Sequence, residues 1–91
     1  MYVIDAETEK KEILKRYRGL LRVYKPKNLK DKKLVRRAFD VAVNAHRDMR
    51  RKSGEPYIYH PISVATIAAG EIGLGATSVV CALLHDVVED T

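Results

Sequence analysis

The stretch of sequence that decides the fold is ALLHDVVEDT, residues 82–91, together with the few residues before it. Apolar residues recur there in adjacent pairs spaced four positions apart: Val79, Val80, Leu83, Leu84, Val87 and Val88. This recurrence predicts a helix with one broad apolar face. Valine is β-branched and common in strands, but the four-residue period does not fit the alternation of a strand.

Polar residues that can bind a metal ion lie between those apolar pairs: His85, Asp86, Glu89 and Asp90. His85 and Glu89 are one helical turn apart, and so are Asp86 and Asp90, which predicts that all four project from the side opposite the apolar face. Three carboxylates and an imidazole with no Lys or Arg among them repel one another unless a positive charge lies nearby. A divalent metal ion is the obvious candidate.

The N-terminal half of the chain predicts two helices. The first is expected over about residues 5–23, with Asp5 as its N-cap and one apolar face. The second is expected from residue 29 or 30 to Lys52, with Gly54 as the stop signal just beyond it. Basic residues cover most of the outer surface of this second helix.

The C-terminal half of the chain contains one more predicted helix, which precedes the helix that includes residues 82–91. It is expected over about residues 61–72, with Pro61 in its first position and Ile67 among the residues that face the core. The last helix then begins at Gly75 or Thr77. With four helices and no strand pattern, the fold class is all-α.

The length of 91 residues suits one small domain, and a hydrophobic fraction of 46% excludes a disordered tail. No apolar run approaches the ~18 residues that a membrane span needs, and the N-terminus does not resemble a signal peptide. The single cysteine cannot form an internal disulfide, which suits a reducing cytosol, so a cytoplasmic location is expected.

The net charge of +5 conceals a strong asymmetry along the chain. All 17 Lys and Arg lie in residues 10–52 beside only four acids, whereas residues 53–91 contain five acids and no Lys or Arg. A basic half and an acidic half favour an anionic ligand at one and a cation at the other. The alternative is that the basic side chains only solvate the helices.

Two histidines precede residues that are themselves informative. His60 comes directly before Pro61, which is expected to start a helix, and His85 comes directly before the possible metal ligand Asp86. Neutral imidazoles with a carboxylate suit Mn, Fe, Co, Ni or Zn better than Ca or Mg. The residue pattern alone leaves another interpretation open, in which His60 caps a helix and His85 is a core imidazole bonded to Asp86.

Other reactive or aromatic residues are expected to be mainly structural. His46 lies in line with the apolar face of the second helix and is predicted to be a partly buried structural residue. Cys81, one turn before the His-Asp pair, is expected to be a small core residue. Of Tyr57 and Tyr59, one is expected to pack in the interior and the other to contact a ligand, and the sequence does not say which.

Two blocks, RKSGEPYIYHP at residues 51–61 and LHDVVEDT at residues 84–91, resemble the N-terminal hydrolase domain of the RelA/SpoT homologue family. These bacterial enzymes make and degrade the alarmone (p)ppGpp. The resemblance covers about residues 30–91 and is specific, because an eleven-residue block and an eight-residue block occur in the same order. It implies an HD-type helical bundle of which this chain holds about the first four helices.

The resemblance also implies roles for individual residues. The metal ligands of the family match His60, His85 and Asp86, and its fourth ligand is an Asp from a helix downstream of residue 91. The acidic pair at its hydrolytic centre matches Glu89 and Asp90. The residues that line its nucleotide pocket match Arg51, Lys52 and Ser53. The metal ion in the family is typically manganese.

The function implied is metal-dependent hydrolysis of the 3′-pyrophosphate of (p)ppGpp, in a parent enzyme that is also a GTP pyrophosphokinase. The 91-residue chain is then an N-terminal fragment of the hydrolase domain, expected to be weak or inactive alone and to self-associate through its apolar faces. Three alternatives remain open: a stand-alone small alarmone hydrolase, a non-catalytic regulatory fragment of a synthetase, and a basic helical nucleic-acid-binding module. The last lacks aromatic interleaving or a recognised DNA-reading motif, so nucleic acid is not the expected partner.

Overall fold

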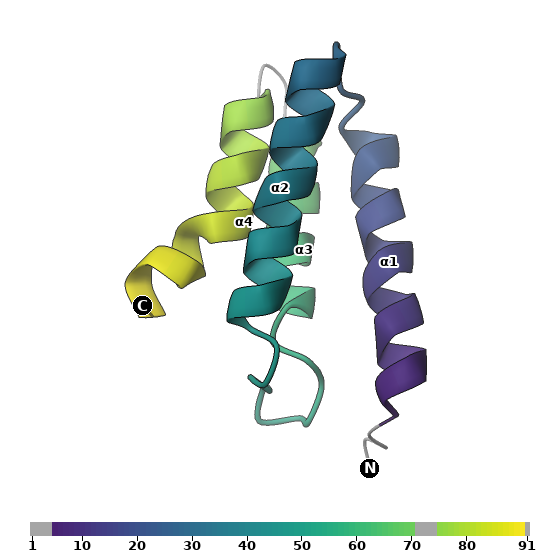
Figure 1. The fold of residues 1–91 in the computed structure, drawn as a ribbon, viewed down its shortest axis with the longest axis vertical. Helices are drawn as coiled ribbons and strands as arrows, with labels where there is room; N and C mark the ends of the chain where they lie inside the picture. Colours follow the sequence, from purple (N-terminus) through teal and green to yellow (C-terminus); the bar gives the residue numbers. More distant parts are fainter. Residues whose placement is uncertain (1–4, 71–74, 91) are drawn as a thin grey trace.

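The protein is an all-α bundle, as the sequence predicts (Figure 1). The computed structural model describes residues 5–70 and 75–90, with side chains in the last helix as far as Val87. Its four helices are α1 (Ala6–Val23), α2 (Leu29–Ala45), α3 (Tyr59–Ala69) and α4 (Ala76–Asp90). Across this described part, the only β pairing is a single isolated bridge between Arg50 and Pro56.

The first two helices begin at side-chain caps. The Asp5 carboxylate accepts hydrogen bonds from the backbone N–H groups of Glu7 and Thr8, as expected for an N-cap. The Thr8 hydroxyl also donates to Asp5 over 2.8 Å, and these hydrogen bonds lower the pKa of the Asp5 carboxyl. At α2, the Asn28 side chain accepts from the N–H of Asp31 at 2.8 Å.

The predicted end of the second helix at Lys52 is wrong, because α2 ends seven residues earlier, at Ala45. The chain beyond it doubles back, and the Tyr57 N–H donates to the Met49 carbonyl at 2.9 Å. Four cations lie close together over residues 47–52, and like charges at helical spacing destabilise a helix. Gly54 therefore does not stop a helix; it lies in the return loop with a positive φ of 97°, which glycine adopts readily.

The third helix starts at Tyr59, two residues earlier than predicted. Pro61 is tolerated there because the first N–H groups of a helix have no partner within it. The helix ends at Ala69, and the predicted end at residue 72 falls outside the described residues. Ile67, predicted to face the core, is 68% exposed.

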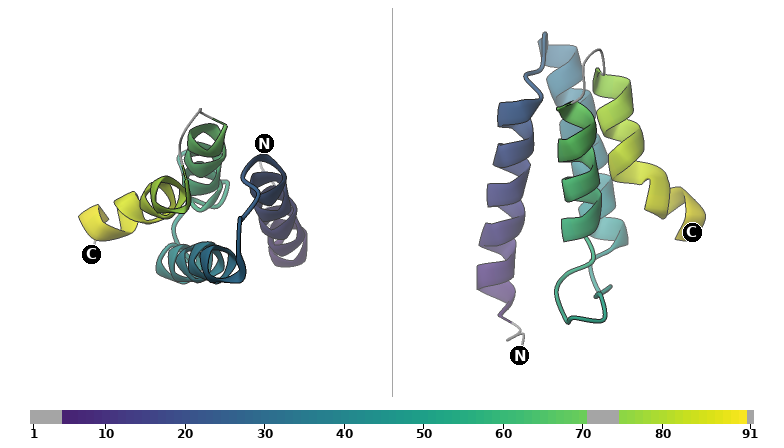
Figure 2. Two further views of the ribbon diagram at one scale, coloured as in Figure 1. Left: turned by 90° about the horizontal axis from the view of Figure 1, so that it is seen from above. Right: turned by 180° about the vertical axis from the view of Figure 1, so that it is seen from behind.

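The core forms where α4 packs against α2 and α3, while α1 packs mainly against α3 (Figure 2). Large side chains with almost no exposure fill its centre: Leu20, Val35, Ile62, Val79 and Leu83. The rings of Tyr17 and Phe39 stack with centroids 4.1 Å apart and link α1 to α2. The last turn of α4 projects away from the other three helices (Figures 1 and 2).

Candidate metal and phosphate site

His85 and Asp86 form a pair of possible metal ligands on α4. His85 Nδ1 lies 2.9 Å from the carbonyl oxygen of Ala82, and a carbonyl can only accept, so Nδ1 carries the proton. In the neutral ring Nε2 then has a free lone pair, and it faces Asp86 Oδ1 at 3.1 Å. Two electron-rich atoms at this distance require a shared proton or a cation between them.

The geometry of this pair fits a transition-metal ion. Ligand atoms that each lie about 2.1 Å from one ion are roughly 3 to 3.4 Å apart, from right-angled to tetrahedral arrangements. The 3.1 Å separation of His85 Nε2 and Asp86 Oδ1 is within that range, and it is also the length of an ordinary hydrogen bond. The hydrogen bond at Nδ1 also fixes the ring orientation, as is usual for histidines that bind metals.

Asp86 points inward, which corrects the prediction that it projects from the outer side of the helix. It is only 8% exposed, and the Tyr57 hydroxyl donates to its Oδ2 at 2.9 Å. Asp86 follows buried Leu83 by three positions, and residues with that spacing lie on the same helical face. One carboxylate oxygen therefore faces His85 and the other is held by Tyr57.

His60 lies in the first turn of α3, near Tyr57. The His60 and Tyr57 ring centroids are 6.1 Å apart in an edge-on arrangement. Among the described residues, no three His, Cys, Asp or Glu side chains come close enough together to hold a metal ion. The pair on α4 is thus assembled, and the inclusion of His60 as a third ligand stays a prediction.

The predicted catalytic carboxylates, Glu89 and Asp90, belong to the last turn of α4. Their side chains lie outside the described residues, so their roles also stay predictions.

An open pocket of about 560 Å³ lies beside Tyr57 and His60. It brings together the predicted substrate-binding residues Arg51, Lys52 and Ser53. Three of the six residues that line it are Arg or Lys and none is acidic, so the pocket suits a polyanion. Tyr57 lies between this pocket and the Asp86 carboxylate, so a single side chain contacts both parts of the site.

The backbone that presents these residues is a closed loop. The Arg51 N–H donates to the Glu55 carbonyl at 3.0 Å, and the Gly54 N–H donates to the Arg51 carbonyl at 2.8 Å. Gly54 makes this reversal with its positive φ. The family resemblance grouped Arg51, Lys52 and Ser53, and the three residues line one pocket. The predicted second helix wrongly included the first two of them, and their role in binding a substrate stays a prediction.

The structure distinguishes the two tyrosines, and the contact of one of them with a ligand stays a prediction. Tyr59 is 6% exposed, and the Arg16 guanidinium lies 4.1 Å from its ring centroid, so Tyr59 packs in the interior. Tyr57 bonds to Asp86 instead. No local signal could identify this pair, because the two residues are 29 positions apart.

Two other sequence predictions have clear outcomes. His46 is buried more completely than the predicted partial burial; its Nδ1 lies 3.2 Å from Met49 Sδ and its ring lies against Tyr57, with centroids 4.9 Å apart. Cys81 is exposed, so its prediction as a core residue is wrong.

In the described part of the chain, no helix is both long and apolar enough to cross a bilayer.

Comparison with known families identifies the class of domain. The profile of the HD domain family matches residues 38–91, more than half of the chain. The matched region contains α3, α4, the loop and the C-terminal half of α2, and α1 lies outside it.

Curated relatives narrow this class. A probable GTP pyrophosphokinase of Mycobacterium leprae is 55% identical over 58 residues, which are 64% of this chain and 7% of that protein. The bifunctional (p)ppGpp synthase/hydrolase SpoT of Escherichia coli K12 is 47% identical over 72 residues, 79% of this chain and 10% of that protein. A guanosine-3′,5′-bis(diphosphate) 3′-pyrophosphohydrolase of Aquifex aeolicus is 44% identical over 57 residues, 63% of this chain and 8% of that protein.

The chain therefore belongs to the HD domain family, as a member of its RelA/SpoT homologues. It spans a tenth or less of the length of these relatives.

Proposed function

We propose that this chain is part of a cytoplasmic (p)ppGpp hydrolase domain, which removes the 3′-pyrophosphate to return GDP or GTP. The observation that carries the proposal is the His85–Asp86 pair, with two electron-rich atoms 3.1 Å apart, next to a pocket lined by cations. A site for a divalent ion beside a site for a polyanion is what phosphate-ester hydrolysis requires. The names of the relatives support the same substrate and a parent protein that is also a GTP pyrophosphokinase.

The proposed cofactor is one Mn²⁺ ion held by His60, His85 and Asp86, with a fourth ligand from beyond residue 91. When bound, such an ion lowers the pKa of a bound water toward neutrality and withdraws charge from a phosphoryl oxygen. Nitrogen and carboxylate donors suit manganese better than calcium, which prefers more oxygen ligands. The Tyr57 hydroxyl, which donates to Asp86 Oδ2, would orient the carboxylate that holds the ion.

The residues of the chain then have distinct tasks. Arg51 and Lys52 bind the phosphates, and Ser53 donates a hydroxyl hydrogen bond to them. Arg51 alternatively stacks on the guanine. Glu89 accepts a proton from the attacking water, with Asp90 assisting it. The water oxygen bonds to the phosphorus nearest the ribose, the bond from that phosphorus to the 3′-oxygen breaks, and the 3′-oxygen leaves as a hydroxyl after it takes up a proton.

The decisive test is manganese-dependent release of pyrophosphate from ppGpp by the complete domain. His60→Ala and Glu89→Ala are each expected to lower the rate by about 100-fold or more, because each removes a group from the reacting centre. Cys81→Ala is the matched control, since Cys81 is exposed on the same helix as Glu89. Unchanged rates in both site variants would remove the assignment.

A separate assay distinguishes the basic nucleic-acid-binding alternative. Affinity for duplex DNA that falls steeply with salt, with no pyrophosphate release, would favour that alternative over the enzyme.

A further inference from the structure

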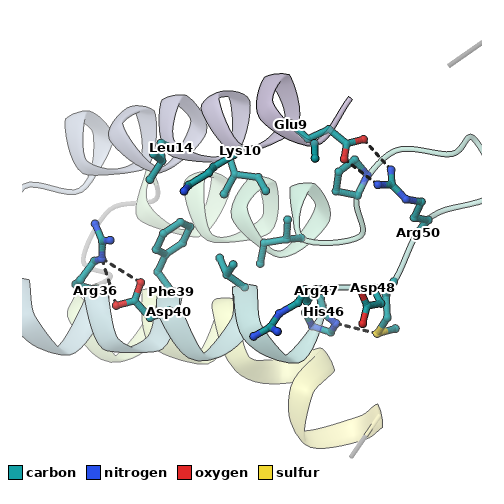
Figure 3. Close-up of a pocket in the computed structure, with 16 residues that line it drawn as sticks. Glu9, Lys10, Leu14, Arg36, Phe39, Asp40, His46, Arg47, Asp48 and Arg50 are labelled. Carbon is teal, nitrogen blue, oxygen red and sulfur yellow. Dashed lines mark hydrogen bonds and ion pairs between the residues drawn. The ribbon is translucent and has the colours of Figure 1, made fainter. Parts of the chain in front are cut away.

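The carboxylate of Glu9, on α1, forms a bidentate ion pair with an arginine of the loop. Arg50 donates from one terminal nitrogen to Glu9 Oε2 at 2.7 Å and from the other to Oε1 at 2.8 Å (Figure 3). The Glu9 side chain is only 9% exposed. Parallel charge-assisted hydrogen bonds of this kind are stronger and more directional than an exposed ion pair.

The same guanidinium also holds the loop that presents the phosphate-binding residues. The Arg50 nitrogen that bonds to Glu9 Oε2 also donates to the carbonyl oxygen of Gly54 at 2.8 Å. Gly54 closes the loop through its own N–H, which donates to the Arg51 carbonyl at 2.8 Å. A continuous path of hydrogen bonds therefore runs from α1, through Arg50, to the backbone of residues 51–54.

Arg50 faces two cavities at once. It lines the phosphate pocket together with Arg51, Lys52 and Ser53. Arg50 also lines a cleft of about 460 Å³ between α1 and α2. Figure 3 shows the Arg50 side chain extending to Glu9. Since Glu9 neutralises Arg50, the phosphate pocket draws its free positive charge from Arg51 and Lys52, while Arg50 supports the loop beneath them.

We propose that α1 supports the phosphate site. Glu9 and Arg50 are positioning residues that hold residues 51–54 in the conformation that binds the ligand. The inference rests on the proposed function for the identity of the pocket. It goes beyond that function because it assigns a role to a helix outside the region that matches the HD domain family. A preformed loop binds a polyanion more tightly than a mobile one, because its ordering cost is met on folding.

The test is amide hydrogen exchange in the 91-residue chain, read at the N–H groups of Arg51 and Gly54. Glu9→Gln removes one charge of the pair, and Arg50→Lys keeps the charge but loses the bidentate geometry. Each is expected to speed exchange at both loop amides by on the order of tenfold, because a charge-assisted contact is lost. The Ile62 amide, which bonds to the Ile58 carbonyl, reports any change in global stability.

The chain offers matched controls for both variants. Glu7→Gln removes a carboxylate from an exposed pair on the same helix, and Arg47→Lys alters an exposed arginine that contacts Asn44. Neither is expected to change the loop amides. The proposal is overturned if both site variants leave the loop amides at the wild-type rate, or speed them only by the factor seen at Ile62. Because Arg50→Lys preserves charge, it still decides the question should Glu9→Gln fail to fold.

A titration with inorganic pyrophosphate separates this inference from the proposed function. Arg50→Lys is expected to weaken binding several-fold at constant net charge, and Arg47→Lys is expected to have no effect. If pyrophosphate does not bind the wild-type chain at all, the assignment of the pocket falls, and the exchange rates still decide whether α1 holds the loop. If the loop loosens and the affinity stays the same, the positioning role is overturned while the pocket stands.

Discussion

Replacing Tyr57 with Phe tests the site by removing a single hydroxyl group. That hydroxyl donates to Asp86 over 2.9 Å, and Asp86 is a nearly buried residue. A hydrogen bond to a charged group contributes about 1.5–3 kcal/mol to the free energy of unfolding. In a domain of this size each kcal/mol corresponds to about 4–8 °C, so Tyr57→Phe is expected to lower the Tm by roughly 6 to 24 °C.

Thermal unfolding followed by circular dichroism, in the presence of a chelator, measures this effect without any metal. Tyr59→Phe is the matched control, because Tyr59 lies two residues away and packs through its ring, which Phe retains. A calorimetric titration with Mn²⁺ then measures the effect on the proposed cofactor. Loss of a group that orients a metal ligand typically costs about 10–100-fold in metal affinity, and Tyr57→Phe is expected to fall in that range.

Each possible result has a distinct meaning. A Tm for Tyr57→Phe equal to that of the wild type would refute the hydrogen bond to Asp86. A larger loss for Tyr59→Phe would reverse the assignment of the two tyrosines. A lowered Tm with unchanged Mn²⁺ affinity would mean that Tyr57 supports the fold and does not orient a metal ligand.

Three further predictions concern the core, the alkaline limit of stability and the pocket. Leu83→Ala is expected to lower the free energy of unfolding by about 3 kcal/mol in denaturant titrations, because Leu83 is fully buried, whereas exposed Ile67→Ala is expected to change it little. Burial raises the pKa of Tyr17 above its ordinary value near 10. The neutral phenol of Tyr17 therefore contributes its full stability below pH ~10, and this stability is lost as the pH rises through the folded-state pKa. Tyr17→Phe, which has no group to ionise, is expected to reduce alkaline unfolding above pH ~10. Arg51→Ala is expected to raise the KM of the complete domain for ppGpp by about tenfold, with Arg47→Ala as the exposed control, and an equal effect of both would assign the loss to net charge.

The apolar surface allows a check on self-association, which was expected from the sequence. Ile67 and Leu29 are both mostly exposed, on α3 and α2 respectively. A monodisperse monomer in solution scattering would contradict that expectation.

Much of the fold could be predicted because helix formation depends on residues a few positions apart. The Asp5 cap, the apolar face of α1 and the paired apolar residues of α4 are all local patterns, and each predicted its helix correctly. The end of α2 was not predictable in this way. Its last predicted turns, up to Lys52, are instead part of a loop held by contacts to residues that follow it in the chain.

For the candidate site too, local patterns were predictable from the sequence and long-range contacts were not. The sequence indicated candidate metal-binding residues through their side-chain chemistry, and the family resemblance indicated candidate phosphate-binding residues. Both roles stay predictions. Only the tertiary structure decided that Tyr57 rather than Tyr59 reaches Asp86, and that Glu9 reaches Arg50 from 41 positions away. The physical reason is that such contacts depend on how the helices pack and where the loop returns, and no short stretch of sequence records the path of the chain between two distant residues.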